Sequence, residues 1–372
     1  MNSPTNLYRT ARRNWAGPLS TIASIICLVT CLTDALGATG KKMSVQGESL
    51  VLVKTEPGKL CFDQVSKGSL TLRSTYVAGK PGGIDYQEGI DYVVDYVAGT
   101  ITRLANSKIP DYSTNCLYGQ KDFDHTKFPS FRNHEWFVWA DYRTTNGKPW
   151  ARPNDQRPNL VEVRTKLAAG GPFKIVSYGD SITSGGEASE LAFRFQQRYA
   201  SYLQGKFPKS KIEVEDVSLS GYTSQQGIDW FDKKPASLQP LTTLGTVVKP
   251  DLVLVGFGMN DHNLGSMDLP KFKQNLVTLV RMVRERKGAE VILFSAFPPN
   301  DQWHYGTHRM AQYADATRQA AAEARCAYVD VYGTWEMVLQ RKDQSSLLGN
   351  NINHPNDFGH WLYEQAFEAM KF

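Results

Sequence analysis

Hydrophobic residues follow two different patterns on either side of a segment of small residues at 168–172, AAGGP. Between residues 44 and 167, short runs rich in β-branched and aromatic residues alternate with turn residues, and no helix of useful length is predicted. The runs are SLVLVKT, SLTLRS, DYVVDY, TITRL, EWFVWADYR and NLVEVRTKL. This pattern predicts an antiparallel, jelly-roll-like β-sandwich as an accessory domain over residues 39–168.

After this segment, nearly continuous apolar runs alternate with amphipathic stretches of helical period. The runs are FKIVSYG, KIEVEDVSL, DLVLVGFG, AEVILFSAF and CAYVDVY, and helices are predicted at 191–207, 271–286 and 310–325. Apolar strands separated by helices are typical of a parallel sheet covered on both faces. Residues 169–372 are therefore predicted to form a three-layer α/β domain, which binds ligands beyond the carboxyl ends of its strands.

The first 38 residues have the pattern of a targeting segment. Three arginines, at positions 9, 12 and 13, precede an apolar run over residues 19–32, and small residues follow, which is the order found in a secretory signal. The run is shorter than the roughly 20 apolar residues that a membrane-spanning helix needs. We therefore expect a cleaved signal peptide and secretion, with a retained membrane anchor as the alternative.

Charge and cysteine content exclude some functions. The formal net charge is +5 for the whole chain and +3 without residues 1–38, which is too small to indicate nucleic-acid binding. Neither a CxxC motif nor a Cys/His cluster of zinc spacing occurs, so no metal or cofactor is expected. A bridge between Cys61 and Cys116 would be compatible with export, and the sequence leaves it open. We expect Cys326 to pack as a small apolar residue.

Residues suited to acyl transfer lie at the ends of the predicted strands. Ser181 follows the first strand in GDSIT, Gly221 the second in SGY, and Asn260 the third in GMND, while His354 precedes the last helix in NHPN. An imidazole with a pKa of about 6.5 can take the proton of a serine hydroxyl near neutral pH. Backbone N–H groups and a side-chain amide at these positions are suited to stabilise a tetrahedral oxyanion.

These four blocks, in this order, resemble the SGNH, or GDSL, hydrolase superfamily over about residues 172–372. The resemblance implies a flavodoxin-like sheet and a serine esterase activity. It also implies that Ser181 is the nucleophile and His354 the general base. The oxyanion donors would be the backbone N–H groups of Ser181 and Gly221 and the side chain of Asn260.

One position departs from the superfamily pattern. Members usually carry Asp three positions before the histidine, where this chain has Asn351. An amide does not stabilise an imidazolium by charge as a carboxylate does. We therefore expect a Ser-His dyad in which Asn351 orients His354 by its side chain or its backbone, with Asp301 as a less favoured alternative.

Three further residues are candidates for substrate binding. Asp180 either binds substrate or holds the turn after the first strand. Trp303 and His304 lie in an aromatic loop after the fourth strand, and they either line the entrance for substrate or pack the loop.

The loops around the predicted site are short, polar and rich in glycine, as in GDSITSGGEAS, GMNDHNLGS and PPNDQWHY. No long apolar segment is available for a fatty chain, which favours a small acyl group, such as acetyl, on a carbohydrate. Exported SGNH proteins with an N-terminal β domain resemble carbohydrate esterases, which agrees with this hypothesis. The alternatives are a lipid or thioester hydrolase and, less favoured, an inactive glycan-binding protein.

Overall fold

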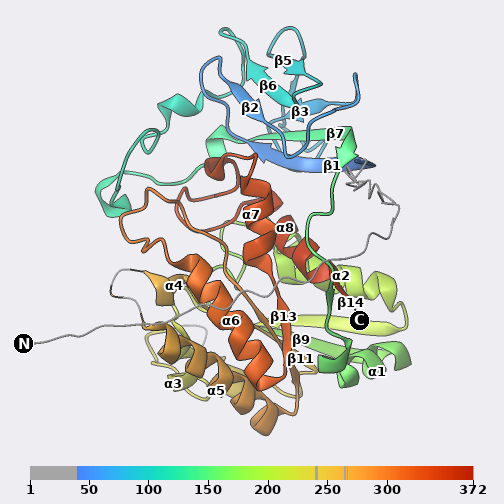
Figure 1. Ribbon diagram of the computed structural model, residues 1–372, viewed down its shortest axis with the longest axis vertical. Helices are drawn as coiled ribbons and strands as arrows, with labels where there is room; N and C mark the ends of the chain where they lie inside the picture. Colours follow the sequence, from blue (N-terminus) through green and yellow to red (C-terminus); the bar gives the residue numbers. More distant parts are fainter. Residues whose placement is uncertain (1–39, 239–241, 264, 266, 372) are drawn as a thin grey trace, which may run out of the picture. The chain divides into compact units, whose positions relative to one another are not determined.

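The computed structural model describes residues 40–371 apart from 239–241, 264 and 266. The described part, from Gly40 onward, forms one compact unit (Figure 1). The predicted signal peptide or anchor, residues 1–38, lies outside the described residues, so secretion remains an expectation. Within the described ranges, no helix is both long enough and apolar enough to cross a membrane.

Antiparallel strands make up the N-terminal region, as predicted. One sheet has four strands in the order β1-β7-β3-β4, and a second has three in the order β2-β6-β5. The strands are β1 (Lys41–Leu50), β2 (Pro57–Lys59), β3 (Thr71–Arg73), β4 (Asp85–Tyr86), β5 (Tyr92–Asp95), β6 (Thr100–Arg103) and β7 (Val138–Gly147). Strand β7 buries Val138, Ala140 and Tyr142 on one face, which is the period of two that a half-buried strand requires.

A parallel sheet forms the centre of the C-terminal region, and this prediction is confirmed. Its strand order is β10-β9-β11-β12-β13, so the first strand in sequence lies between the second and the third, as in flavodoxin-like sheets. The strands are β9 (Gly171–Gly179), β10 (Ser210–Asp216), β11 (Leu252–Gly256), β12 (Glu290–Phe294) and β13 (Ala327–Val329). All residues of β11 are buried, because helices cover both faces.

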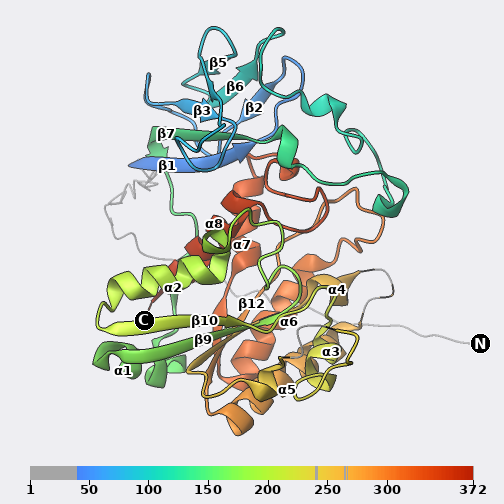
Figure 2. The same cartoon turned by 180° about the vertical axis from the view of Figure 1, so that it is seen from behind.

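Helices complete the three predicted layers. They are α1 (Val161–Ala169), α2 (Phe195–Lys206), α3 (Ser224–Asp229), α4 (Met259–His262), α5 (Leu269–Lys287), α6 (Met310–Ala324), α7 (Val331–Leu339) and α8 (Asp357–Glu368). Figures 1 and 2 show α5 and α6 on one face of the sheet and α2 and α8 on the other. Helix α5 buries Phe272, Leu276, Leu279 and Val283, the spacing of one helical face, and ends at Gly288 in the left-handed conformation.

Some predicted strand runs are wrong in whole or in part. The run SLVLVKT is a strand only at Ser49 and Leu50, where β1 ends. The run NLVEVRTKL forms helix α1, because its buried residues, Val163 and Leu167, are four positions apart, while Val161 is 50% exposed. The run CAYVDVY ends as a strand before Asp330, whose side chain accepts a hydrogen bond from the N–H of Gly333 and begins α7. A short parallel pair, β8 (Asn154–Asp155) with β14 (Met370–Lys371), joins the C-terminus to the connecting segment.

A buried ion pair joins the two regions. The Nζ of Lys342, after α7, lies 2.6 Å from Oε1 of Glu48 on β1, and both side chains are 0% exposed. Glu48 also accepts hydrogen bonds from the Tyr142 hydroxyl (2.7 Å) and the Cys61 N–H (2.9 Å). The charge is therefore compensated by three donors.

The described cysteines are all free, so the bridge between Cys61 and Cys116 that the sequence left open is not formed. Cys116 is exposed, and its thiol donates to the carbonyl of Ser130. Cys326 is buried, as expected, and burial raises its thiol pKa to about 12.

Candidate active site

Ser181, the predicted nucleophile, lies in a tight turn directly after β9. The Asp180 carboxylate accepts hydrogen bonds from the N–H groups of Ile182 (3.0 Å) and Thr183 (3.3 Å). The Thr183 hydroxyl donates to the carbonyl of Gly256 at the end of β11 (2.9 Å), which ties the turn to the neighbouring strand. The turn therefore fixes the serine at the carboxyl edge of the sheet, between the ends of β10 and β11.

His354, the predicted base, reaches the serine from the loop before α8. Its Nε2 lies 2.7 Å from Oγ of Ser181, which is hydrogen-bonding distance. Burial lowers the pKa of His354 below its usual value of 6.5, and the negative charge of Glu187 partly opposes this effect. The imidazole is therefore neutral at neutral pH, as a general base must be.

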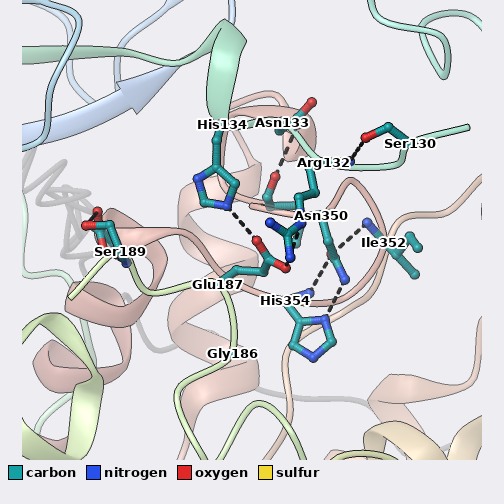
Figure 3. Close-up of polar contacts among 12 residues, drawn as sticks. Ser130, Arg132, Asn133, His134, Gly186, Glu187, Ser189, Asn350, Ile352 and His354 are labelled. Atoms are coloured by element: carbon teal, nitrogen blue, oxygen red, sulfur yellow. Dashed lines mark hydrogen bonds and ion pairs between the residues drawn. The ribbon is translucent and has the colours of Figure 1, made fainter. Parts of the chain in front are cut away.

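Asn350 contacts the other ring nitrogen of His354, as Figure 3 shows. Its Nδ2 lies 2.5 Å from Nδ1 of His354. Its Oδ1 accepts hydrogen bonds from the backbone N–H groups of Ile352 (3.0 Å), Asn353 (2.9 Å) and His354 (2.9 Å). These three donors fix the amide with its NH₂ toward the ring. Nδ1 is then an acceptor, and the neutral imidazole carries its proton on Nε2.

The role predicted for Asn351 needs correction. Among the described residues, no hydrogen bond joins Asn351 to His354 by side chain or backbone. Its Oδ1 accepts from the hydroxyl of Tyr112 (2.6 Å), and its carbonyl accepts from the amide of Asn300 (2.7 Å). Asn351 has a φ of 58°, which is the left-handed conformation. The side chain that contacts the imidazole is therefore that of the preceding residue, Asn350. Asp301, the less favoured alternative, uses its backbone N–H to bind Gln344 in another loop.

The predicted oxyanion donors lie at the ends of three adjacent strands. Asn260 donates one N–H of its amide to the carbonyl of Tyr222 (2.8 Å), which leaves the second N–H for a ligand. Within the described residues, the backbone N–H groups of Ser181 and Gly221 make no hydrogen bond. Gly221 has a φ of +80°, a conformation that favours glycine. The arrangement thus retains free donors beside the nucleophile, as stabilisation of an oxyanion requires.

Asp180 is enclosed by the turn that it holds. Its side chain is 2% exposed, and burial raises its pKa to about 7. Substrate cannot reach this carboxylate, so the prediction that Asp180 binds substrate is wrong. The alternative from the sequence, that Asp180 holds the turn, accounts for its position.

Trp303 packs its loop rather than lining an open pocket. It is 6% exposed and belongs to a small apolar cluster with Leu117, Phe123 and Ile352, and its indole N–H donates to Nδ1 of His125 (3.1 Å). The predicted role of Trp303 in binding substrate is therefore also corrected. His304 is more exposed, and its Nδ1 lies 2.9 Å from the carboxylate of Asp122. Its predicted role stays a prediction.

The N-terminal region supplies side chains beside His354 that sequence reasoning missed. Glu187 lies in the same loop as the nucleophile, six positions after Ser181. Its carboxylate accepts a hydrogen bond from Nε2 of His134 (2.5 Å) and lies 4.0 Å from Nε of Arg132. Burial opposes ionisation of Glu187, but His134, Arg132 and His354 together lower its pKa. No sequence signal pairs these residues, since His134 and Glu187 are 53 positions apart.

No group of three or more His, Cys, Asp or Glu side chains that could hold a metal ion occurs among the described residues. His360, on α8, is buried and donates through Nε2 to the carbonyl of Gly186 (3.1 Å). It therefore supports the turn below the predicted site.

The chain is similar to known proteins over its C-terminal region. The family model for the GDSL-like Lipase/Acylhydrolase family matches residues 177–362, which is half of the chain. No curated protein matched the sequence.

Several solved structures are similar to part of the chain. Axe2, an acetylxylan esterase from Geobacillus stearothermophilus, is 24% identical with a TM-score of 0.42, over 54% of this chain and 94% of that chain. LAE5, an α/β hydrolase from the metagenome of Lake Arreo, Spain, is 23% identical with a TM-score of 0.43, over 55% and 97%. A two-domain esterase active on acetylated mannans is 22% identical with a TM-score of 0.44, over 59% and 53%.

The family match includes Ser181, Gly221, Asn260 and His354, the residues that the fold brings to one edge of the parallel sheet. Its description names the acylhydrolase chemistry for which a serine, a neutral imidazole and free N–H donors are suited. The chain is a member of the GDSL-like lipase/acylhydrolase family, with an SGNH hydrolase fold, and is a carboxylic ester hydrolase.

Proposed function

We propose that the protein hydrolyses small acyl esters, acetyl esters above all, on a carbohydrate by a Ser-His mechanism. The observation that carries this proposal is the 2.7 Å contact between Nε2 of His354 and Oγ of Ser181. Free N–H donors on Ser181, Gly221 and Asn260 lie on adjacent strand ends and support it.

In the first half of the reaction, Oγ of Ser181 forms a bond to the ester carbonyl carbon, and its proton moves to Nε2 of His354. The carbonyl oxygen becomes an oxyanion, which the free N–H donors stabilise. The intermediate then expels the alcohol, which takes the proton from His354, and an acyl-serine remains. Water attacks the acyl group with His354 again as base, and this step releases the acid and restores the serine.

This sequence requires a free lone pair on Nε2, whereas the Asn350 amide favours the tautomer with a proton there. The reactive tautomer is therefore the minor form of the neutral imidazole. We expect kcat to be lower than it would be if a carboxylate stood in the place of the Asn350 amide.

The polar groups around the nucleophile support a small acyl group on a hydrophilic alcohol. The charge of Glu187 acts on His354, and Arg132 and His134 lie beside Glu187. Asn260 follows β11, the strand next to the one that ends at the nucleophile turn. A fatty chain needs an extended apolar lining, whereas sugar hydroxyls bind to charged and amide groups.

The test is a comparison of initial rates on p-nitrophenyl acetate, butyrate and octanoate, together with acetate release from acetylated xylan and acetylated mannan. We expect a preference for acetate and release from at least one polymer. In Ser181→Ala we expect kcat to fall at least about a thousandfold, because nucleophile and base act as a unit. A preference for octanoate would favour a lipid hydrolase, and activity retained in Ser181→Ala would contradict the mechanism.

A further inference from the structure

We propose that Glu187 is the acidic partner of His354, and that its carboxylate stabilises the imidazolium that forms when Ser181 loses its proton. Glu187 is thus a positioning residue that acts through His354. This inference rests on the proposed Ser-His mechanism, which requires a transient positive charge on the ring. An imidazolium buried without a compensating charge is costly, so an acidic partner has a direct effect on rate.

No acidic residue occupies the position before His354 where the superfamily usually carries one. Asn350 presents an NH₂ group to Nδ1, and its oxygen is already used by three backbone N–H groups. Asn351 binds Tyr112 and Asn300 instead. Among the described residues, Glu187 is the acidic group whose charge acts on His354.

The chain holds Glu187 close to the ring. A Cβ on the preceding Gly186 would lie 2.7 Å from Cδ2 and 3.2 Å from Nε2 of His354, so this backbone touches the imidazole. The N–H of Gly186 donates to the carbonyl of Ser181 (2.8 Å), which ties the segment to the nucleophile turn. The Cβ of Glu187 would lie 2.6 Å from a Cβ on Gly349, next to Asn350. Glu187 is therefore confined between the nucleophile turn and the histidine loop.

Three consecutive residues of the N-terminal region fix this arrangement, and Figure 3 shows Glu187 between His134 and His354. His134 binds the carboxylate of Glu187 at 2.5 Å, and Arg132 lies 4.0 Å from it. The N–H of Asn133, between them, donates to the carbonyl of Gly349 (2.8 Å). Glu187 has a φ of 66°, a conformation that is unfavourable for a residue with a side chain and that persists only where its surroundings hold it.

The charged groups around this pair are few. Glu187 faces His134 and Arg132 from the N-terminal region and His354 from the loop before α8. His360 of α8 faces His354 from below, and burial lowers its pKa to about 3, so it stays neutral. The side chain of Glu187 is 16% exposed, which limits screening of its charge by solvent.

The decisive variant is Glu187→Gln, which removes the charge and keeps the shape. We expect kcat to fall about tenfold or more, since one pKa unit corresponds to a tenfold change in equilibrium. We also expect the acidic limb of the kcat/KM profile to move to lower pH, because the imidazole loses its proton more easily without the nearby negative charge. Glu190→Gln, in the same loop and paired with exposed Lys80, is the control and should match the parent.

A second variant separates the effect of the negative charge of Glu187 from the effect of its contact with the N-terminal region. His134→Gln changes the group that binds the carboxylate of Glu187 but leaves the charge of Glu187, so the acidic limb of its kcat/KM profile should not move to lower pH. Equal effects of Glu187→Gln and His134→Gln would overturn the inference, as would a parental profile in Glu187→Gln.

Unfolding temperatures identify a variant that fails to fold. In that case Glu187→Asp, which keeps the negative charge, should retain the acidic limb of the parent enzyme. If Ser181→Ala kept activity, the mechanism itself would fail. An inactive Ser181→Ala beside a parental Glu187→Gln would refute only the role of Glu187.

Discussion

Asn350 presents its amide nitrogen to Nδ1 of His354 because three backbone N–H groups already occupy its oxygen. This single orientation determines which ring nitrogen carries the proton in the resting enzyme. In a Ser-His-Asp triad the carboxylate at this place selects the opposite tautomer, and in a serine protease its replacement by an amide costs about four orders of magnitude in turnover. The residue that limits the proposed reaction is therefore a neighbour of the position that the sequence pattern indicated.

Asn350→Asp should increase activity. A carboxylate would accept the three backbone N–H groups with one oxygen and the Nδ1–H of His354 with the other, which frees Nε2 as a base. We expect kcat on p-nitrophenyl acetate to rise about tenfold or more. The acidic limb of the kcat/KM profile should move to higher pH, because the added negative charge favours the imidazolium. A fall in kcat with an unchanged unfolding temperature would show that the amide does not restrain the histidine.

The pH profile of the unaltered enzyme follows from the burial of His354. Burial lowers the pKa of this histidine, and Glu187 only partly compensates. The base form therefore persists below the ordinary histidine pKa of about 6.5, and activity is lost only as the pH falls through the lower value. We expect the acidic midpoint of kcat/KM to lie below about pH 6.5. A midpoint at or above that value would mean that the ring is more hydrated or more strongly paired than its burial indicates.

At the scale of elements, the turn after β9 and the loop before α8 meet at Gly186. A Cβ at this position would lie 2.7 Å from Cδ2 of His354 and 2.9 Å from the carbonyl of Ser181, and neither neighbour can move without disturbing the dyad. The absence of a side chain at Gly186 is therefore a condition for the 2.7 Å contact between His354 and Ser181.

Gly186→Ala should reduce kcat at least about tenfold while the protein stays folded, because a misplaced base weakens proton transfer. Gly205→Ala is the matched control, since Gly205 lies in helix α2 and a Cβ there meets open space. We expect that control to keep its activity and to gain about 0.5–1 kcal/mol of stability from the better helix former. Equal activity of the two variants would contradict the close contact between Gly186 and the imidazole.

The elements that the sequence predicted correctly are those with a strong periodic signal. The apolar runs of the parallel sheet and the long helices α5 and α6 were predictable, because burial on both faces or on one stripe leaves a clear pattern. Helix α1 was not, since the alternation in VEV imitates a strand. Ser181, Gly221, Asn260 and His354 could be named as candidates because each follows or precedes a predicted element. Asn350 and Glu187 were missed, because their contacts depend on loop conformations with no periodic signature.

At the scale of the whole molecule, the N-terminal region takes part in the site. Tyr112 holds Asn351, and Asn133 binds the carbonyls of Gly349 and Leu348, so segments far apart in sequence define the loop that carries His354. The buried ion pair between Lys342, after α7, and Glu48, on β1, also joins the N-terminal and C-terminal regions. The predicted boundary between residues 168 and 169 stays a prediction, but the site draws residues from both sides of it.

Lys342→Met should destabilise the protein by about 3–5 kcal/mol, because it leaves the Glu48 carboxylate buried without its cation. Replacing both partners, as in Glu48→Gln with Lys342→Met, should cost less than Lys342→Met alone, since no unpaired charge is left. Chemical denaturation of the three proteins measures the difference. A double variant less stable than the single one would show that Glu48 has a role beyond this ion pair.

The account depends most on Ser181 as the nucleophile, and covalent labelling tests this directly. The enzyme would be treated with diethyl p-nitrophenyl phosphate, and the labelled peptide identified by mass spectrometry. We predict a stoichiometric burst of p-nitrophenol, a single phosphorylated peptide that contains Ser181, and no label in Ser181→Ala. A label on another residue, or full esterase activity after complete labelling of Ser181, would contradict the account.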